Sequence, residues 1–296
     1  MQSTPASSNF RALLFGATGQ IGAAVLVRLL ALGWEVTAVS RRPPAGSSAG
    51  VTWVAGDLGN LPEMSEAFDL LISCGPLDHF AAWYARSGCM TGRVIAFGST
   101  SVLVKGNSID PAEQDLALRL KTAEQLLFDL AAARGAGLTV LRPTLVWGAG
   151  LDRSLSRIAS LASRFGHFAL PSNATGRRQP VHVEDLAMAV MQLLDCPSSH
   201  AKAYAVGGGE VLGYRQMVGK VLDALPGRPV LWSLPGPVFG IVAAAGRRAG
   251  LLSGFTPAVL ARMQQDLVFD LTPAQQDFGY APRGFNPTAA ELGLAQ

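Results

Sequence analysis

Three glycines spaced three residues apart constrain the fold of this chain more than any other feature. Gly16, Gly19 and Gly22 follow an apolar run at residues 12–15 and open a helical segment at residues 20–32. In a strand–turn–helix unit, the first glycine permits the tight turn, and the second lets the backbone approach a pyrophosphate. The third lets the helix pack close to the sheet. The motif predicts a dinucleotide-binding turn; the alternative is a plain glycine turn between a strand and a helix.

The first half of the chain repeats this alternation of strand and helix. Apolar runs of strand length recur, and helical segments at residues 20–32 and 111–134 lie between some of them. The runs are at residues 12–15, 35–39, 51–54, 70–73, 94–97 and 138–141, with one more at 203–206. Strands separated by helices predict a parallel sheet covered on both faces. We expect an α/β fold, a doubly wound parallel Rossmann sheet with a smaller, mostly helical C-terminal substrate region.

The domain boundaries follow from where the alternation stops. Residues 1–9 are polar and are expected to form a flexible N-terminus. The dinucleotide-binding Rossmann domain is predicted at residues 10–148 and roughly 181–225. The substrate-binding region is then 149–180 and 226–296.

The helix after residue 110 has clear terminal signals. Asp110 can cap it, Pro111 suits the first helical position, Glu113 can complete a capping box, and Gly135 can close it.

Composition excludes several classes of protein. Hydrophobic residues make up 49% of the chain and charged residues 15%, which argues against extended disorder. A net charge of +3 is too small to indicate nucleic acid binding. The three cysteines match no metal or disulfide spacing, so we expect no metal site and a cytoplasmic location. The uncharged stretch at residues 229–246 contains three prolines, and a helix at about 238–252 without stable membrane insertion is expected.

The end of the second predicted strand indicates which dinucleotide binds. An acidic residue there would bind the ribose 2′-hydroxyl of NAD, but this chain has Ser40, Arg41 and Arg42. Guanidinium groups suit a 2′-phosphate, so NADP (NADPH) is expected in preference to NAD. An ordinary solvated arginine pair is the alternative. Asp57 is expected to bind the adenine amino group, or else to close a turn on its own backbone.

The residues expected to contact the cofactor extend from the glycine turn along the carboxyl ends of the strands. They are Gly16, Thr18, Gly19, Gln20, Ile21, Gly22, Arg41, Arg42, Asp57, Leu58, Cys74, Gly75 and Pro143.

Four segments outside the glycine turn resemble one known family. Residues 97–102 (FGSTSV) are similar to its Ser/Thr motif, and residues 141–148 (LRPTLVWG) to the segment beside the nicotinamide. Residues 178–187 resemble the stretch whose arginine contacts a substrate diphosphate, and residues 203–208 a strand that returns to the sheet. The chain thus resembles an extended or atypical short-chain dehydrogenase/reductase of the NAD(P)-dependent epimerase/dehydratase group.

The chain departs from this family at the catalytic motif. Catalysis in the family uses Tyr-x-x-x-Lys on the helix after the Ser/Thr motif. If Lys121 is the lysine, the tyrosine position holds Ala117; if Glu124 sets the alignment, the pair becomes Leu116 and Leu120. The four tyrosines all lie outside this helix, at Tyr84, Tyr204, Tyr214 and Tyr280.

Other groups are candidates for the missing chemistry. By resemblance, Ser99 is expected to donate a hydrogen bond to a substrate carbonyl, although its cluster could be only a hydrogen-bonded strand end. Lys121 is a candidate acid if burial lowers its pKa; it could instead pair with Glu124 on a solvated helix face. Tyr84 could reach the site, or simply pack beside Trp83.

The later half of the chain is expected to shape the substrate pocket, together with Thr100 of the Ser/Thr motif. Thr100, Arg178 and His182 are the candidates, because Arg178 offers a fork for phosphate or carboxylate and His182 could orient it. His182 could also be a satisfied interface histidine. Arg153 and Arg157, four residues apart, could add positive charge or form a solvated face.

Two functions are consistent with this sequence. The first is an NADP-dependent oxidoreductase or epimerase/dehydratase that acts on a small or nucleotide-linked anionic substrate with atypical proton transfer. The second is a catalytically weak or inactive NADP(H)-sensing binding protein, which the missing tyrosine suggests.

Overall fold

A seven-stranded parallel sheet forms the centre of the protein. The computed structural model describes residues 10–46, 49–61, 64, 66–152, 154–248 and 257–294; the predicted flexible N-terminus, residues 1–9, lies outside the described residues. The strand order is β11-β6-β5-β4-β1-β2-β3. The strands are β1 (Arg11–Phe15), β2 (Glu35–Ser40), β3 (Val51–Ala55), β4 (Ala67–Ser73), β5 (Met90–Phe97), β6 (Gly137–Pro143) and β11 (Lys202–Val206). All seven predicted apolar runs lie in this sheet, and the predicted doubly wound α/β fold is confirmed.

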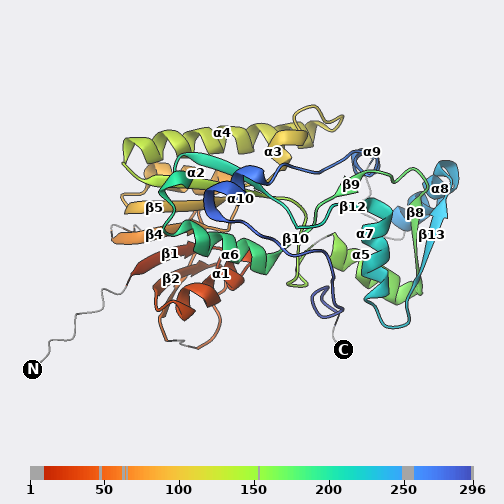
Figure 1. The fold of residues 1–296 in the computed structure, drawn as a ribbon, viewed down its shortest axis with the longest axis horizontal. Coiled ribbons are helices and arrows are strands. Elements are labelled where there is room, and N and C mark those ends of the chain that lie inside the picture. Colours follow the sequence, from red (N-terminus) through yellow and green to blue (C-terminus); the bar gives the residue numbers. More distant parts are fainter. Residues whose placement is uncertain are drawn as a thin grey trace, which may run out of the picture.

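Alternating side chains of each strand fill two hydrophobic cores. In β1, Ala12 and Leu14 face one core, while Leu13 and Phe15 face the other. Helices α1 (Gln20–Ala31) and α6 (Val183–Leu193) pack together over the first core. Helices α2 (Leu77–Arg86) and α4 (Pro111–Ala133) pack together over the second, on the opposite face of the sheet (Figure 1). Burial on both faces explains why the strands are continuous apolar runs.

A smaller lobe lies beyond the carboxyl edge of the sheet (Figure 1). Its helices are α5 (Leu155–Phe165), α7 (Tyr214–Asp223), α8 (Gly236–Arg248) and α9 (Pro257–Arg262), and its strand pair is β8 (His167–Pro171) with β13 (Val230–Leu234). Its core contains Trp147, Leu155, Phe168, Met217 and Phe285 among others.

Short elements complete the described chain. Two small ribbons pair β7 (Val146–Trp147) with β10 (Val181–His182) and β9 (Arg177–Arg178) with β12 (Leu212–Gly213). The remaining elements are α3 (Ser101–Val104), η1 (Pro197–Ser199) and α10 (Thr272–Phe278). Helix α8 covers part of the predicted helix at 238–252. Among the described residues, no helix is long and apolar enough to cross a bilayer.

The packing divides the two lobes differently from the predicted boundaries. Helix α7 was expected in the Rossmann domain, but its apolar face packs on α5 in the core of the smaller lobe. Helix α10 was expected in the substrate region, but Ala274 and Phe278 pack on β11 and α6 in the Rossmann core. Both helices pack where their apolar faces are covered, irrespective of their distance along the chain.

The start of α4 agrees with its predicted signals in part. The Asp110 carboxylate accepts a hydrogen bond from the Ala112 amide at 3.0 Å, and Gly135 adopts a left-handed φ of 68° after the helix. Glu113 does not complete a capping box, since its carboxylate accepts a hydrogen bond from Ser108 and pairs with Lys105 and Arg262. Lys105 and Arg262 bind the carboxylate that a capping box would use.

We expect Asp110→Ala to lower the free energy of unfolding by about 1 kcal/mol, because the α4 N-terminus loses its side-chain cap. Urea unfolding followed by circular dichroism measures the change. Asp129→Ala removes an exposed carboxylate from the same helix without removing a cap. An equal loss of stability in both variants would contradict the capping role of Asp110.

Candidate functional site

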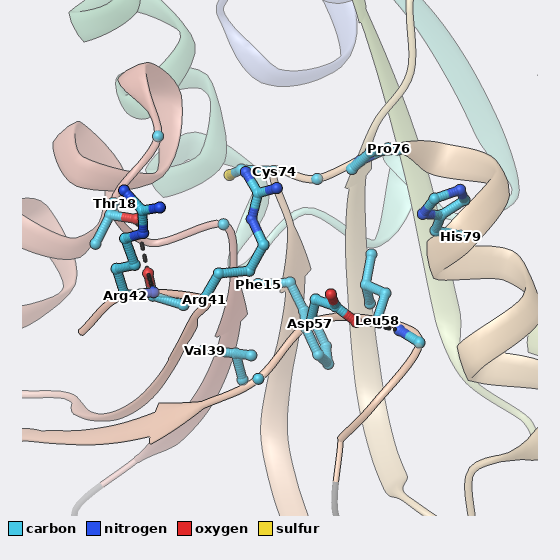
Figure 2. A pocket seen from close by; sticks show the side chains of 16 residues that line it. Phe15, Thr18, Val39, Arg41, Arg42, Asp57, Leu58, Cys74, Pro76 and His79 are labelled. Atoms are coloured by element: carbon cyan, nitrogen blue, oxygen red, sulfur yellow. Dashed lines mark hydrogen bonds between the residues drawn. The ribbon is translucent and has the colours of Figure 1, made fainter.

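Two cavities lie along the carboxyl edge of the sheet. Parallel strands present all their carboxyl ends at one edge, where α/β sheets bind ligands. The first cavity, of about 990 Å³, lies at the ends of β1, β2, β3 and β4 (Figure 2). The second, of about 370 Å³, lies where β5 and β6 end and the smaller lobe begins.

The glycine turn forms one side of the first cavity. Gly16 has a left-handed φ of 75°, and a Cβ there would lie 3.1 Å from the Cys74 carbonyl carbon. Gly19 is the N-cap of α1, and no side chain caps the helix. A Cβ on Gly22 would lie 2.1 Å from the Gly16 carbonyl oxygen, so a side chain would push α1 off the turn. The first amides of α1 thus have no side-chain acceptor, which suits an anion at the positive end of the helix.

Two arginines and a hydroxyl pair form the cavity wall at the end of β2. The Thr18 and Ser40 hydroxyl oxygens lie 2.9 Å apart, and the Arg42 amide donates to the Ser40 hydroxyl at 3.2 Å. Arg42 lies beside Thr18, and Arg41 extends over the cavity between the glycine turn and the Asp57 loop (Figure 2). Both guanidinium groups belong to exposed residues that line the cavity.

Asp57 closes a turn, which is one of the two roles that the sequence left open. Its Oδ1 accepts hydrogen bonds from the Gly59 amide at 2.8 Å and the Asn60 amide at 3.1 Å, which closes a turn. The residue also lines the cavity opposite the glycine turn (Figure 2). The turn fixes the carboxylate where a ligand in the cavity can meet it.

The structure brings most of the predicted cofactor residues into this cavity. Its lining includes Gly16, Thr18, Gly19, Arg41, Arg42, Asp57, Leu58, Cys74 and Gly75. Gln20, Ile21, Gly22 and Pro143 are outside the lining. Burial raises the pKa of the Cys74 thiol, which therefore stays protonated.

Sequence reasoning missed several lining residues, namely Phe15, Val39, Pro76 and His79. Each lies at or just after the carboxyl end of a strand, or in the first turn of α2. Their position at the end of a predicted strand could have identified them as lining residues, because their residue types do not indicate contact with a dinucleotide.

Hydroxyl groups line the sheet side of the second cavity. Ser99, Thr100 and Ser101 follow β5, and Thr144 follows β6. The Ser99 hydroxyl accepts a hydrogen bond from the Ser101 amide at 3.1 Å, and Thr100 donates to the Pro143 carbonyl at 3.1 Å. The opposite wall comes from the smaller lobe and is largely apolar, with Leu155, Ile158, Met217, Val259, Met263, Leu267 and Phe269.

Arg178 lines the second cavity, but its guanidinium already has partners. It donates to the carbonyl oxygens of Arg177 and Gln265 at 2.7 Å each and of Arg262 at 2.5 Å. The guanidinium carbon lies 5.0 Å from the centre of the Tyr214 ring. Burial lowers the pKa of this guanidinium. Arg178 thus fixes the chain from Arg262 to Gln265 as a wall of the cavity.

The other two cations of this cavity share one carboxylate. Lys105 lies 3.3 Å from Glu113, and Arg262 also pairs with Glu113. This carboxylate at the start of α4 therefore compensates positive charge on both sides of the cavity.

Comparison with known proteins agrees with this geometry. Residues 12–89 match the sequence profile of the NAD dependent epimerase/dehydratase family. A UDP-glucose 4-epimerase of Vibrio cholerae is 25% identical over 60% of this chain, and the match spans 53% of the epimerase, about half its length. A 2-alkyl-3-oxoalkanoate reductase of Shewanella oneidensis is 24% identical over 91% of this chain, and the match covers 82% of the reductase.

A solved structure, MoeE5 in complex with UDP-glucose and NAD, has the same fold. It covers 96% of both chains with a TM-score of 0.66 at 19% identity. The chain is thus similar to this family in its first quarter and to this solved structure in its fold. The glycine turn, the seven-stranded sheet and the Ser/Thr segment after β5 are the parts of this structure that the sequence predicted.

Helix α4 has no tyrosine in either register considered for the family motif, because the two positions hold Ala117 and Lys121 or else Leu116 and Leu120. Leu120 is buried in the core under α4, and the partly buried Leu116 packs against the same core. Lys121 is exposed and lines neither cavity, so the structure does not bring this predicted acid to the site. It is also not paired with Glu124 as the alternative had it, since Glu124 is buried and pairs with Arg142 of β6.

The four tyrosines lie outside α4 in the structure. Tyr84 stacks on Phe80 in the core beneath Arg134, as the packing alternative predicted. Tyr204 donates to the Asp277 carboxylate at 2.5 Å and Tyr280 to the Gly207 carbonyl at 2.8 Å. Tyr214 lines the second cavity with Ser99, and no feature of the sequence indicated that.

His182 does not line the second cavity, which corrects its predicted role as a substrate residue. It is 4% exposed and caps α6, with Nδ1 accepting from the Glu184 amide at 3.1 Å. Nε2 therefore carries the proton and lies 3.2 Å from the Glu291 carboxylate. The interface alternative was the correct one for this histidine. Arg153 lies outside the described residues, and Arg157 does not line the second cavity.

We expect His182 to make stability fall in mild acid. Burial, then the charge of Arg283, lowers its pKa below 6.5, so between the two values the unfolded chain binds more protons than the native one. Its contribution is complete above pH 6.5 and is lost as the pH falls through the lower native pKa, where protonation of Nδ1 removes the cap.

The free energy of unfolding at pH 7.5, 6.5 and 5.5 measures this effect. His182→Asn keeps a cap acceptor and should show a smaller decrease than the parent protein. The exposed His167 on β8 provides the control, and His167→Asn should keep the parent dependence. A His182→Asn profile that matches the parent would contradict the assignment.

Proposed function

We propose that this protein is an NADP(H)-dependent oxidoreductase that acts on a small carbonyl-type substrate. The single observation that carries the proposal is the first cavity, where an uncapped helix N-terminus and two arginines border a space of about 990 Å³. A bound nicotinamide dinucleotide would supply or accept a hydride. The family match at residues 12–89 supports this class of cofactor.

The preference for NADP(H) follows from charge at the end of β2. Arg41 and Arg42 line the cavity where the 2′ position of the adenosine ribose would lie. Asp57, the acidic residue among the described lining residues, lies after β3 instead and is held in a turn. Guanidinium groups bind phosphate with charge-assisted hydrogen bonds, which NAD cannot use.

The second cavity is the proposed substrate site. Its position at the ends of β5 and β6 continues the same edge of the sheet, where the reactive end of an extended dinucleotide would reach. Ser99 would hold the substrate carbonyl by donating a hydrogen bond. Tyr214 offers a phenol in the same cavity and is our candidate for the proton that the family tyrosine would otherwise exchange.

The lining favours a small substrate with an apolar part over a nucleotide-linked one. Carbonyl oxygens occupy the Arg178 guanidinium, and Glu113 compensates both Lys105 and Arg262. An anionic substrate group would have to displace one of these partners. The apolar wall and the volume of about 370 Å³ suit a compact ligand. The reductase relative is named for an alkyl-substituted oxoalkanoate, which has a ketone, apolar chains and one carboxylate that would have to displace such a partner.

One observation favours a second candidate function. Leu116 and Ala117 leave the catalytic helix without a phenol, as expected for a protein that binds NADP(H) and senses its redox state without turnover. Binding of NADPH with no oxidation across carbonyl, enone, imine and sugar-nucleotide panels would favour this candidate.

Location and assembly complete the proposal. A reducing, cytoplasmic setting is supported by the free thiols Cys74, Cys89 and Cys196. A homodimer is proposed through α4, where Leu118 and Leu126 are exposed.

We expect Arg41→Asp to weaken NADPH binding by about tenfold or more and to leave NADH binding unchanged or stronger, because only NADPH loses a charge-assisted contact. Fluorescence titration of the reduced dinucleotides measures both affinities. Arg215 is an exposed residue of α7, and Arg215→Asp makes the same charge change there as a control for net charge. Equal losses for NADPH and NADH would contradict the 2′-phosphate site.

We expect Ser99→Ala to lower kcat by about 100-fold, the cost of removing one donor to a developing oxyanion. Steady-state oxidation of NADPH with a substrate found in the panel measures it. Lys121→Ala should leave kcat unchanged, because Lys121 lies outside the cavities.

Tyr214→Phe tests the proposed proton donor. We expect the pH profile of kcat to be flat in this variant, because the phenol that exchanges the proton is absent. A profile identical to that of the parent protein would reject the role of Tyr214.

A further inference from the structure

The far end of the smaller lobe exposes an unusual set of large apolar side chains. Strand β13 exposes Val230 and Trp232, two residues apart and hence on one face, each 54% accessible. Helix α8 exposes Val238, Ile241 and Val242, and Ile241 is 72% accessible. Phe165, at the end of α5, is exposed as well. We call these six residues the apolar patch.

The elements that bear the apolar patch lie together. Strand β13 pairs with β8, and α8 contacts β8, so strand and helix share one end of the molecule (Figure 1). Val230 pairs with His167 in this ribbon, and His167 lies two residues after Phe165 in the sequence. Single exposed apolar residues are ordinary, but a group of this size on adjoining elements marks a surface that meets another apolar phase.

Helix α8 has two distinct apolar faces. Phe239 and Ala243, four residues apart, are buried against the lobe. Val238, Ile241 and Val242 recur at the spacing of a second face, which is exposed. A helix that only packed on this lobe would have polar residues there.

The chain segments that bear the apolar patch carry charge of one sign. The sequence contains no Asp or Glu from residue 224 to 265, a stretch that includes Arg228, Arg247, Arg248 and Arg262. Residues 153–183, which include α5 and β8, also contain no carboxylate and five arginines. Asp266, which ends the first stretch, is paired with Arg177.

We propose that the apolar patch is a peripheral binding surface for an anionic phospholipid bilayer. Exposed aliphatic side chains of α8 and the Trp232 ring would enter the headgroup boundary, where Trp is favoured. The surrounding arginines, among them Arg164 and Arg248, would face the anionic headgroups. The helix lies on the surface and does not span the bilayer. This property is independent of the dinucleotide site and of the substrate.

Vesicle sedimentation of the full chain tests the proposal. We expect the protein to pellet with phosphatidylcholine vesicles that contain phosphatidylglycerol, and far less with phosphatidylcholine alone. Ile241→Glu should reduce binding to the anionic vesicles at least tenfold, because it puts a repelled charge on the patch. Arg164→Gln with Arg248→Gln should reduce it about fivefold per arginine, with a smaller dependence on salt.

The control moves the same substitution to another exposed apolar position. Val27 on α1 is 67% accessible, and Val27→Glu should bind vesicles like the parent protein. An unchanged midpoint of thermal unfolding shows that each variant is folded. Absence of binding to anionic vesicles would overturn the membrane surface. Loss of a dimer in Ile241→Glu, seen by light scattering without vesicle binding, would overturn it too and identify the patch as a contact between copies.

Discussion

The close approach of α1 to the end of β1 is the contact on which the rest of the site depends. No side chain fits at Gly22, because its Cβ would overlap the Gly16 carbonyl oxygen. The same contact directs the uncapped N-terminus of α1 at the first cavity. Packing of the core and anion binding therefore share one structural requirement. A change that moves α1 outward would disturb the apolar contacts of Val25 and Leu29 as well as the site.

Buried charge is used in the second cavity mainly to hold the lobes together. Arg178 binds carbonyl groups that precede and follow the turn after α9, and Glu113 of α4 binds Arg262 of α9. The Glu113–Arg262 pair connects the smaller lobe to α4 of the larger one. Each buried cation needs a partner in the folded chain, because an unpaired charge is costly to bury. The cavity that results is bordered by hydroxyl and apolar groups, which explains why its cations give little attraction for a highly charged ligand.

Lys121 and His182 have surroundings in the fold that their neighbours in the sequence do not predict. Lys121 and Glu124 lie three positions apart and suggested a surface pair, but the helix turns Glu124 inward to Arg142 and leaves Lys121 in solvent. His182 lies four residues after Arg178, yet a change of direction between β10 and α6 makes it a helix cap. Spacing in the sequence predicts which residues lie near one another along the chain. The direction of each side chain in the fold decides which partner it contacts.

The sequence by itself determined the seven strands, the two flanking layers and most of the lining of the first cavity. Apolar periodicity and glycine spacing are local signals, and parallel strands must present their carboxyl ends at one edge. The tertiary structure alone decided that α7 belongs to the smaller lobe, that Tyr214 lines the second cavity with Ser99, and that the Arg178 guanidinium is occupied. These outcomes depend on partners more than 80 residues away in the case of Arg178, and no local pattern encodes such contacts.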